Sequence, residues 1–273
     1  RDGSGVGADQ IAGLGRSVFQ TLLFFAVMLL CFIVPGQTAA AIAGERERQT
    51  LVPLQVTMLR SRSILMGKLL ASLAFVGLLV VATTPLAAVA FALGGVETIE
   101  VVKALGMLLV IATALASIAL LCSTLMRRTQ GATVVTYGAV LMMTIGSFMA
   151  FGMQMSLSQG ESVSDQKVLQ LNPFMAVASV LDDPGDGQGG FSPFEPMQSL
   201  LRQRSEPQNP AFVAARQVGP DGEFRDFEAQ REPRPSGLNQ LPFSALALLG
   251  YAVVIVGSLA LAAYVLQVPR AAP

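Results

Sequence analysis

Long apolar stretches without charge, separated by short polar connections, dominate the chain. Five such stretches cover residues 17–44, 69–96, 104–126, 129–160 and 235–269. Each exceeds the roughly 20 residues that an α-helix needs to cross the hydrocarbon core of a bilayer. The pattern therefore predicts an all-α polytopic membrane protein with five transmembrane helices.

A long polar segment, about residues 156–240, interrupts this pattern before the last apolar stretch. Asn172 followed by Pro173 predicts the start of a short helix that extends to Leu181. The sequence Ser-Pro-Phe-Glu at 192–195 predicts the start of a second short helix. Residues 212–218 and 223–228 flank a Gly-Pro-Asp-Gly turn and favour two short strands. We expect a small mixed cap in this segment.

Lysine and arginine gather in two of the short connections and in the tail. These residues are Arg46, Arg48, Arg60, Arg62, Lys68, Arg127, Arg128 and Arg270. Because such residues are enriched in cytoplasmic loops, we expect them on the cytoplasmic side. The connection that holds Lys103 with Glu97 and Glu100 is then external.

This orientation predicts an external N-terminal loop and a cytoplasmic C-terminus. The predicted layout is an external loop at 1–16, a four-helix region at 17–155 with a cytoplasmic segment at 45–68, an external cap at 156–240, a last helix at 241–268 and a tail at 269–273. The chain begins with Arg1 instead of Met, and we expect that its natural start is missing.

Composition excludes several classes of function. The chain is 52% hydrophobic and 13% charged, which argues against a free-standing cytosolic protein. Its net charge is +0, so it lacks the basic excess of a nucleic-acid-binding protein. Histidine, the commonest general base and a usual zinc ligand, is absent, and Cys31 and Cys122 lie in apolar stretches. We therefore expect no catalytic residue and no metal site.

Charged side chains are missing from the five apolar stretches as drawn here. Ion-coupled carriers and proton pumps usually place such groups inside the membrane, so the sequence argues against both. Gly67 and Lys68 lack the remaining residues of a GxxxxGK[ST] phosphate-binding loop, since Arg62 and Leu69 stand at its other positions. Nucleotide chemistry, if the protein uses it, must come from a partner.

The most specific segment follows the first apolar stretch. It reads Ala-Gly-Glu-Arg-Glu-Arg-Gln-Thr-Leu at 43–51 and Ser-Ile-Leu-Met-Gly-Lys-Leu-Leu at 63–70. Acidic and basic residues alternate over 45–48, and Leu51 and Leu54 are spaced to share one helix face. Such a segment can dock on another protein. It can also be a solvated turn whose arginines follow the positive-inside rule, and the spacing leaves both interpretations open.

These residues resemble the cytoplasmic coupling stretch of permease subunits of ABC-2 type transporters. The resemblance covers residues 43–70 closely and the five stretches with their large loop loosely. It implies that a coupling helix contacts a separate ATPase. Met58 stands where a Pro usually follows the Thr, and Pro53 interrupts the stretch, so we expect a short or bent helix. The implied coupling residues are Glu45, Arg46, Glu47, Arg48, Thr50, Leu51 and Leu54.

The resemblance also implies a function. Permeases of this family have six helices with both ends cytoplasmic, so this chain resembles one that lacks its first helix. It would be the permease subunit of an ATP-binding cassette exporter in the plasma membrane of a bacterial or archaeal cell. Its implied partners are an ABC ATPase subunit, a second permease subunit in a homo- or heterodimer, and the lipid bilayer.

ATP and Mg²⁺ would be bound by the ATPase, so we expect no cofactor and no enzymatic activity on this chain. Its cargo and substrate-binding residues are unknown, although apolar spans without a fixed charge favour an amphiphilic or hydrophobic cargo. The alternative is a membrane scaffold or sensor that transports nothing and whose external cap binds a partner.

Overall fold

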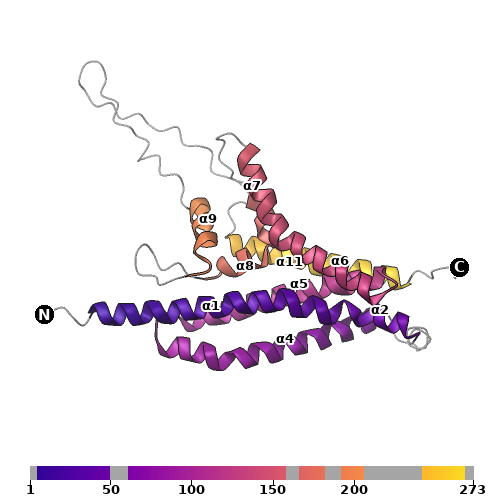
Figure 1. Ribbon diagram of the computed structural model, residues 1–273, viewed down its shortest axis with the longest axis horizontal. Helices are drawn as coiled ribbons and strands as arrows, with labels where there is room; N and C mark the ends of the chain where they lie inside the picture. Colours follow the sequence, from indigo (N-terminus) through magenta and orange to yellow (C-terminus); the bar gives the residue numbers. More distant parts are fainter. Residues whose placement is uncertain (1–4, 50–60, 158–165, 182–191, 206–241, 268–273) are drawn as a thin grey trace, which may run out of the picture.

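A computed structural model describes residues 5–49, 61–157, 166–181, 192–205 and 242–267 (Figure 1). Helices account for the regular structure in these ranges, and no strand occurs within them. The predicted all-α class is therefore confirmed. The two strands expected at 212–218 and 223–228 lie outside the described residues.

The described residues of the first half of the chain form four helices. Helix α1 (Gly5–Thr38) is followed by the short α2 (Ala40–Glu47), and then by α4 (Ser61–Ala92) and α5 (Thr98–Leu125). Because α1 begins at Gly5, most of the segment 1–16 that was expected to be a loop is helical. Pro35 lies inside α1, close to its end at Thr38, and the helix is interrupted at Ala39 before α2 begins.

The second half supplies two more long helical segments. Helix α6 (Thr129–Leu141) continues through the π-helical segment η1 (Met142–Gly146) into α7 (Ser147–Leu157), and α11 (Phe243–Gln267) ends the described chain. The sequence predicted a helix over this region but not the π segment. A π turn has one extra residue per turn, and such segments are frequent at functional sites.

Four helical segments within the described residues are long and apolar enough to cross a membrane. They are Ile11–Glu47, Thr98–Leu125, Thr129–Met153 and Phe243–Leu266, and α4 adds a shorter apolar stretch, Ser63–Leu79. In the part of the chain that the structure describes, each of the five apolar stretches is mainly helical, and the protein is a polytopic membrane protein.

Among the described residues between α7 and α11 there are three short helices. They are η2 (Gln166–Leu171), α8 (Pro173–Ala178) and α9 (Glu195–Ser205). As predicted, Asn172 caps α8, since its Oδ1 accepts hydrogen bonds from the N–H groups of Phe174 (2.9 Å) and Met175 (3.4 Å). Helix α8 is shorter than expected, because it ends at Ala178 instead of Leu181.

Helix α5 forms the centre of the bundle. It contacts α1, α2, α4, α6, α8 and α11. Ala112, Ala116 and Ala119 are fully buried on it, and such small side chains allow neighbouring helices to approach closely.

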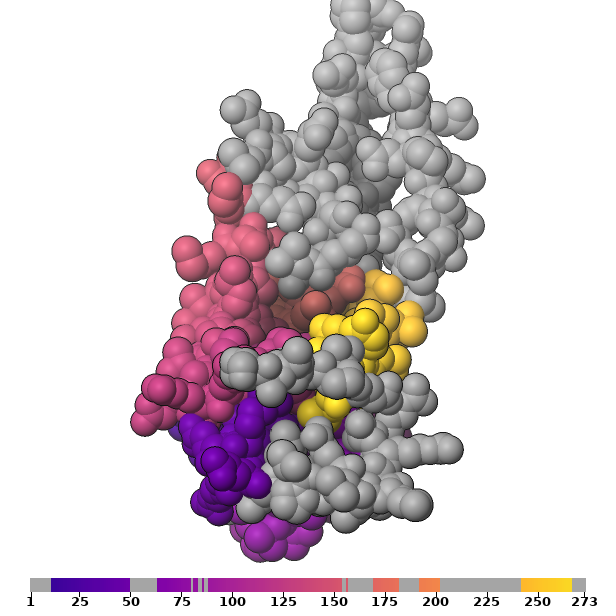
Figure 2. Space-filling view, turned by 90° about the vertical axis from the view of Figure 1, so that its right-hand side faces the viewer, coloured from indigo at the N-terminus to yellow at the C-terminus, as the bar shows by residue number. Residues whose placement is uncertain are grey.

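The bundle has two distinct ends (Figure 1). The α2 end comprises α2, the start of α4, the α5–α6 turn at 126–128 and the end of α11; Figure 2 views the molecule from this side. The α8 end comprises the start of α1, the α4–α5 turn at 93–97, α8 and α9.

Candidate functional site

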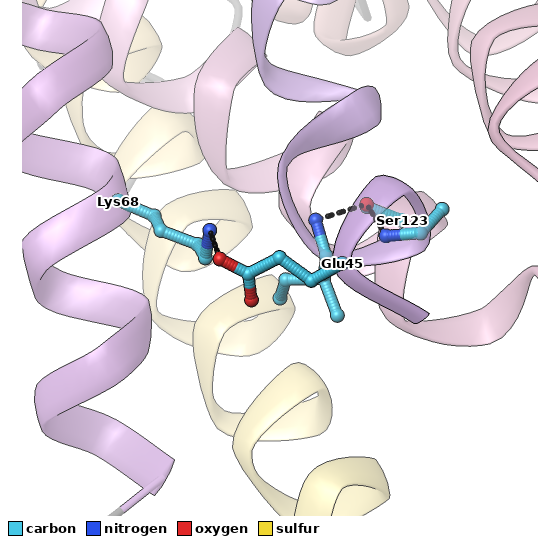
Figure 3. A network of polar contacts seen from close by, with 5 residues as sticks. Glu45, Lys68 and Ser123 are labelled. Atoms are coloured by element: carbon cyan, nitrogen blue, oxygen red, sulfur yellow. Dashed lines mark hydrogen bonds and ion pairs between the residues drawn. The ribbon is translucent and has the colours of Figure 1, made fainter. Parts of the chain in front are cut away.

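The start of α2 is fixed by a side chain from α5. Ala39 precedes α2 and offers no side-chain cap. Instead, Oγ of the fully buried Ser123 accepts hydrogen bonds from the N–H groups of Ile42 (3.0 Å) and Ala43 (2.9 Å), as Figure 3 shows. Because the first N–H groups of a helix lack partners within the helix, this hydroxyl supplies the acceptor that the buried Ile42 N–H needs, and it adds a second acceptor for that of Ala43.

The next contact joins α2 to the end of α5. Nη1 of Arg46 donates to the carbonyl oxygen of Met126 at 2.8 Å, and its guanidinium also lies 3.3 Å from the carbonyl oxygen of Thr124. The last carbonyl groups of a helix lack N–H partners and carry partial negative charge. Arg46 therefore caps the C-terminus of α5.

Glu47 makes the complementary contact with α6. Its carboxylate accepts hydrogen bonds from the backbone N–H (2.9 Å) and the hydroxyl (2.6 Å) of Thr129, the first residue of α6. A negative charge at a helix N-terminus is favourable because the exposed N–H groups carry partial positive charge. Adjacent residues of α2 thus hold the two helix ends that flank the turn at 126–128.

Glu45 joins α2 to α4. Its Oε1 lies 2.7 Å from Nζ of Lys68, and the two side chains are 30% and 21% exposed. In Figure 3 the two side chains point toward one another across the space between their helices. The side chains of Glu45, Arg46 and Glu47 with their partners Lys68, Met126 and Thr129, together with Ser123, which accepts from the α2 backbone, are called the α2 network below.

Comparison with models of protein families identifies the family of this chain. The profile of the family described as ABC-2 family transporter protein matches residues 4–267, which is nearly the whole chain. The chain belongs to the ABC-2 transporter family. Comparisons with curated proteins and with solved structures gave no significant match.

In this ABC-2 family protein, the predicted coupling residues fall into two groups. Glu45, Arg46 and Glu47 are brought together in the α2 network, each bonded to a different helix. Arg48 is exposed, and its backbone N–H donates to the carbonyl oxygen of Gly44 at the end of α2. The others, Thr50, Leu51 and Leu54, lie outside the described residues.

Sequence reasoning missed the partners of these residues. Ser123 stands in the last turns of α5, and Thr129 opens α6 directly after two arginines. Hydroxyl residues are common where helix ends need capping, so both positions carried a usable signal. The sequence did not show that α2 would lie beside both helix ends.

The ABC-2 protein also has a buried ion pair at its α8 end. Nη2 of Arg16 lies 3.4 Å from Oε2 of Glu100, and the Glu100 side chain is 1% exposed. The sequence placed both residues in external connections. That expectation was wrong for their local structure, because α1 and α5 begin before them and the pair lies between these helices.

Proposed function

We propose that this ABC-2 protein is the permease subunit of an ATP-driven exporter. Two permease subunits, identical or different, assemble with two separate ATPase subunits, which bind ATP and Mg²⁺. This chain itself then needs no cofactor and carries out no catalysis. Family membership supports the proposal.

The charge distribution supports an orientation in the plasma membrane of a bacterial or archaeal cell. Arg46, Arg48 and Lys68 lie at the α2 end, as do Arg127 and Arg128 in the α5–α6 turn. Since lysine and arginine are enriched in cytoplasmic loops, the α2 end and the C-terminus are cytoplasmic in this proposal.

The observation that carries the coupling proposal is the α2 network. Charged side chains of α2 bond to α4, to the end of α5 and to the start of α6. A displacement of α2 therefore acts on three membrane-spanning helices at once. In this mechanism, closure of the ATPase subunits on ATP displaces residues 45–62, and the bundle reorients to open a path outward.

The two groups of coupling residues have different roles in this mechanism. Arg48, Thr50, Leu51 and Leu54 contact the ATPase. Glu45, Arg46 and Glu47 transmit the displacement, because their side chains are engaged with helices of the same chain. All seven act in coupling, and we assign none of them to cargo binding.

The test compares variants of both groups in the complex with the ATPase. Leu51→Ala should reduce co-purification of the ATPase. Glu47→Ala should retain co-purification, since Glu47 is bonded to Thr129, but should abolish ATP-dependent transport. Glu97→Ala is the matched control, because this exposed glutamate precedes α5 at the α8 end without a side-chain cap bond.

Two results would contradict the proposal. If the chain is purified from its native membrane without any associated ATPase, the proposed assembly with an ATPase subunit is wrong. Parental assembly and transport in both Leu51→Ala and Glu47→Ala would remove the coupling assignment and favour the non-transporting scaffold.

A further inference from the structure

The side chain of Asn172 makes four hydrogen bonds that join two separate parts of the chain. It is fully buried, and its Oδ1 caps α8. Its Nδ2 donates to the carbonyl oxygen of Thr144 (2.9 Å) in η1 and to Oγ of Ser147 (2.7 Å), the first residue of α7. The amide thus uses its acceptor for α8 and both donor hydrogens for the α6–η1–α7 helix.

Packing holds the side chains of η1 only in part, since Met143 packs partly buried against the hydrophobic core. No residue of η1 is buried, and Met142 and Ile145 are 73% and 58% exposed. The Thr144 carbonyl oxygen accepts a second hydrogen bond, from Oγ of Ser147 at 2.9 Å. An extra residue per turn disturbs the usual bonding between backbone groups of a helix. The side-chain donors of Asn172 and Ser147 at this carbonyl oxygen therefore stabilise the π geometry.

Helix α8 is in turn anchored in the bundle. Met175, Ala176 and Val177 are fully buried in the hydrophobic core. The ring of Phe174 lies 5.1 Å from that of Phe24 in α1. The hydroxyl of Tyr251 in α11 donates to the carbonyl oxygen of Leu171 at 3.0 Å, directly before Asn172. Asn172 is therefore held on a fixed part of the bundle.

We propose that Asn172 is a positioning residue that ties α8 to η1, so that α8 and the α6–η1–α7 helix move together during transport. The same helix begins at Thr129, where Glu47 of the α2 network is bonded. From Thr129 to Thr144 it spans roughly 22 Å at 1.5 Å per residue. A displacement that enters through Glu47 thus reaches α8 through Asn172, and this part of the proposal rests on the proposed function.

The variant Asn172→Ser separates the two halves of this contact. Serine is as good an N-cap as asparagine, so α8 keeps its cap, but serine lacks the amide that reaches Thr144 and Ser147. Thr144→Val is the matched control, because the Thr144 hydroxyl donates to the carbonyl oxygen of Val140 within its own helix and not to Asn172.

The first measurement is hydrogen exchange of the full chain in lipid nanodiscs without an ATPase. Asn172→Ser should speed exchange of the amides at 142–147 by about tenfold, as expected for the loss of hydrogen bonds to a buried group, and leave α5 unchanged. Thr144→Val should change it less than about threefold. Parental exchange at 142–147 in Asn172→Ser would overturn the linkage.

The second measurement uses the complex with the ATPase and asks for a readout that a purely structural role would leave unchanged. In the parent, ATP should alter exchange in both 129–157 and 166–178. In Asn172→Ser it should alter the first region alone. If ATP alters both regions in the variant, the joint movement is refuted. If no ATPase associates with the parent, the proposed function fails, whereas the first measurement still decides the linkage.

Discussion

The two ends of the bundle are held together by different kinds of contact. At the α2 end, Ser123, Arg46 and Glu47 supply side-chain hydrogen bonds to the termini of other helices. At the α8 end, beside the Arg16–Glu100 ion pair, backbone packs closely against backbone: a Cβ on Gly95 would collide with the carbonyl oxygen of Ala12, and one on Gly15 with that of Gly94.

Because of this difference, polar groups at the α2 end can exchange their hydrogen-bond partners, whereas the packed backbone at the α8 end cannot. Capping bonds at a water-exposed helix end, such as those of Glu47, are worth about 1 kcal/mol each, and water or another protein can replace them, unlike the buried bonds to Ser123. Close backbone packing has no such substitute, because any added volume must displace a helix. The end that we propose to meet the ATPase is therefore the adaptable one.

The largest expected effect concerns which side of the membrane each end faces. Thr98 and Gln130 are exposed and uncharged. Thr98 is the first residue of α5, at the α8 end, and Gln130 is the second residue of α6, at the α2 end. In a background without Cys31 and Cys122, a membrane-impermeant maleimide should label Thr98→Cys in intact cells. Gln130→Cys should react after permeabilisation alone. The opposite labelling would invert the proposed orientation.

Next in size is the packing of the α4–α5 turn on α1. Gly94 and Gly95 both have positive φ, 80° and 84°, so alanine costs about 1 kcal/mol in backbone strain at either. A Cβ on Gly94 meets nothing within 4 Å, whereas Gly95 faces the Ala12 backbone. Gly95→Ala should therefore destabilise the protein by about 1–3 kcal/mol more than Gly94→Ala. Equal unfolding midpoints in detergent would show that this turn does not pack closely.

A smaller effect is expected at the start of α2. Ser123→Ala removes the acceptor of the buried Ile42 N–H, and a second acceptor of the Ala43 N–H, and should cost about 1–3 kcal/mol in unfolding free energy. Ser117→Ala is the control, because this serine is equally buried on α5 but bonds to the carbonyl oxygen of Ala114 in its own helix. If Ser123→Ala and Ser117→Ala lower the midpoint of thermal unfolding in detergent by the same amount, Ser123 is not a cap of α2.

The smallest effect belongs to the Glu45–Lys68 ion pair. Both side chains are partly exposed, so water screens the pair. A double-mutant cycle with Glu45→Gln and Lys68→Met should give a coupling energy below about 1 kcal/mol in unfolding. A coupling of several kcal/mol would show that the α2 end is as rigid as the α8 end.

Local sequence signals predicted the helices well. The five apolar stretches are helical, and the Asn172 cap and the helix after Ser192 occur where side-chain chemistry indicated. These features depend on neighbours in the sequence, namely apolar length and capping residues.

The features that the sequence did not reveal depend on distant residues. Asn172 bonds to Thr144, 28 positions earlier, and Glu100 pairs with Arg16 across 84 positions. The π segment, Met-Met-Thr-Ile-Gly, contains no proline or glycine pair that would signal a break in a helix. The amide of Asn172, which donates to it, comes from another part of the chain. No periodicity within one segment encodes such contacts.

The α2 network also has a consequence for the order in which the protein is made. Arg46 and Glu47 bond to residues 80 and 82 positions later in the chain. When α2 leaves the ribosome, neither the end of α5 nor the start of α6 has been synthesised. The α2 network is therefore completed only after α6 has been made, so a partly made chain lacks the contacts that we propose to transmit the ATPase's movement.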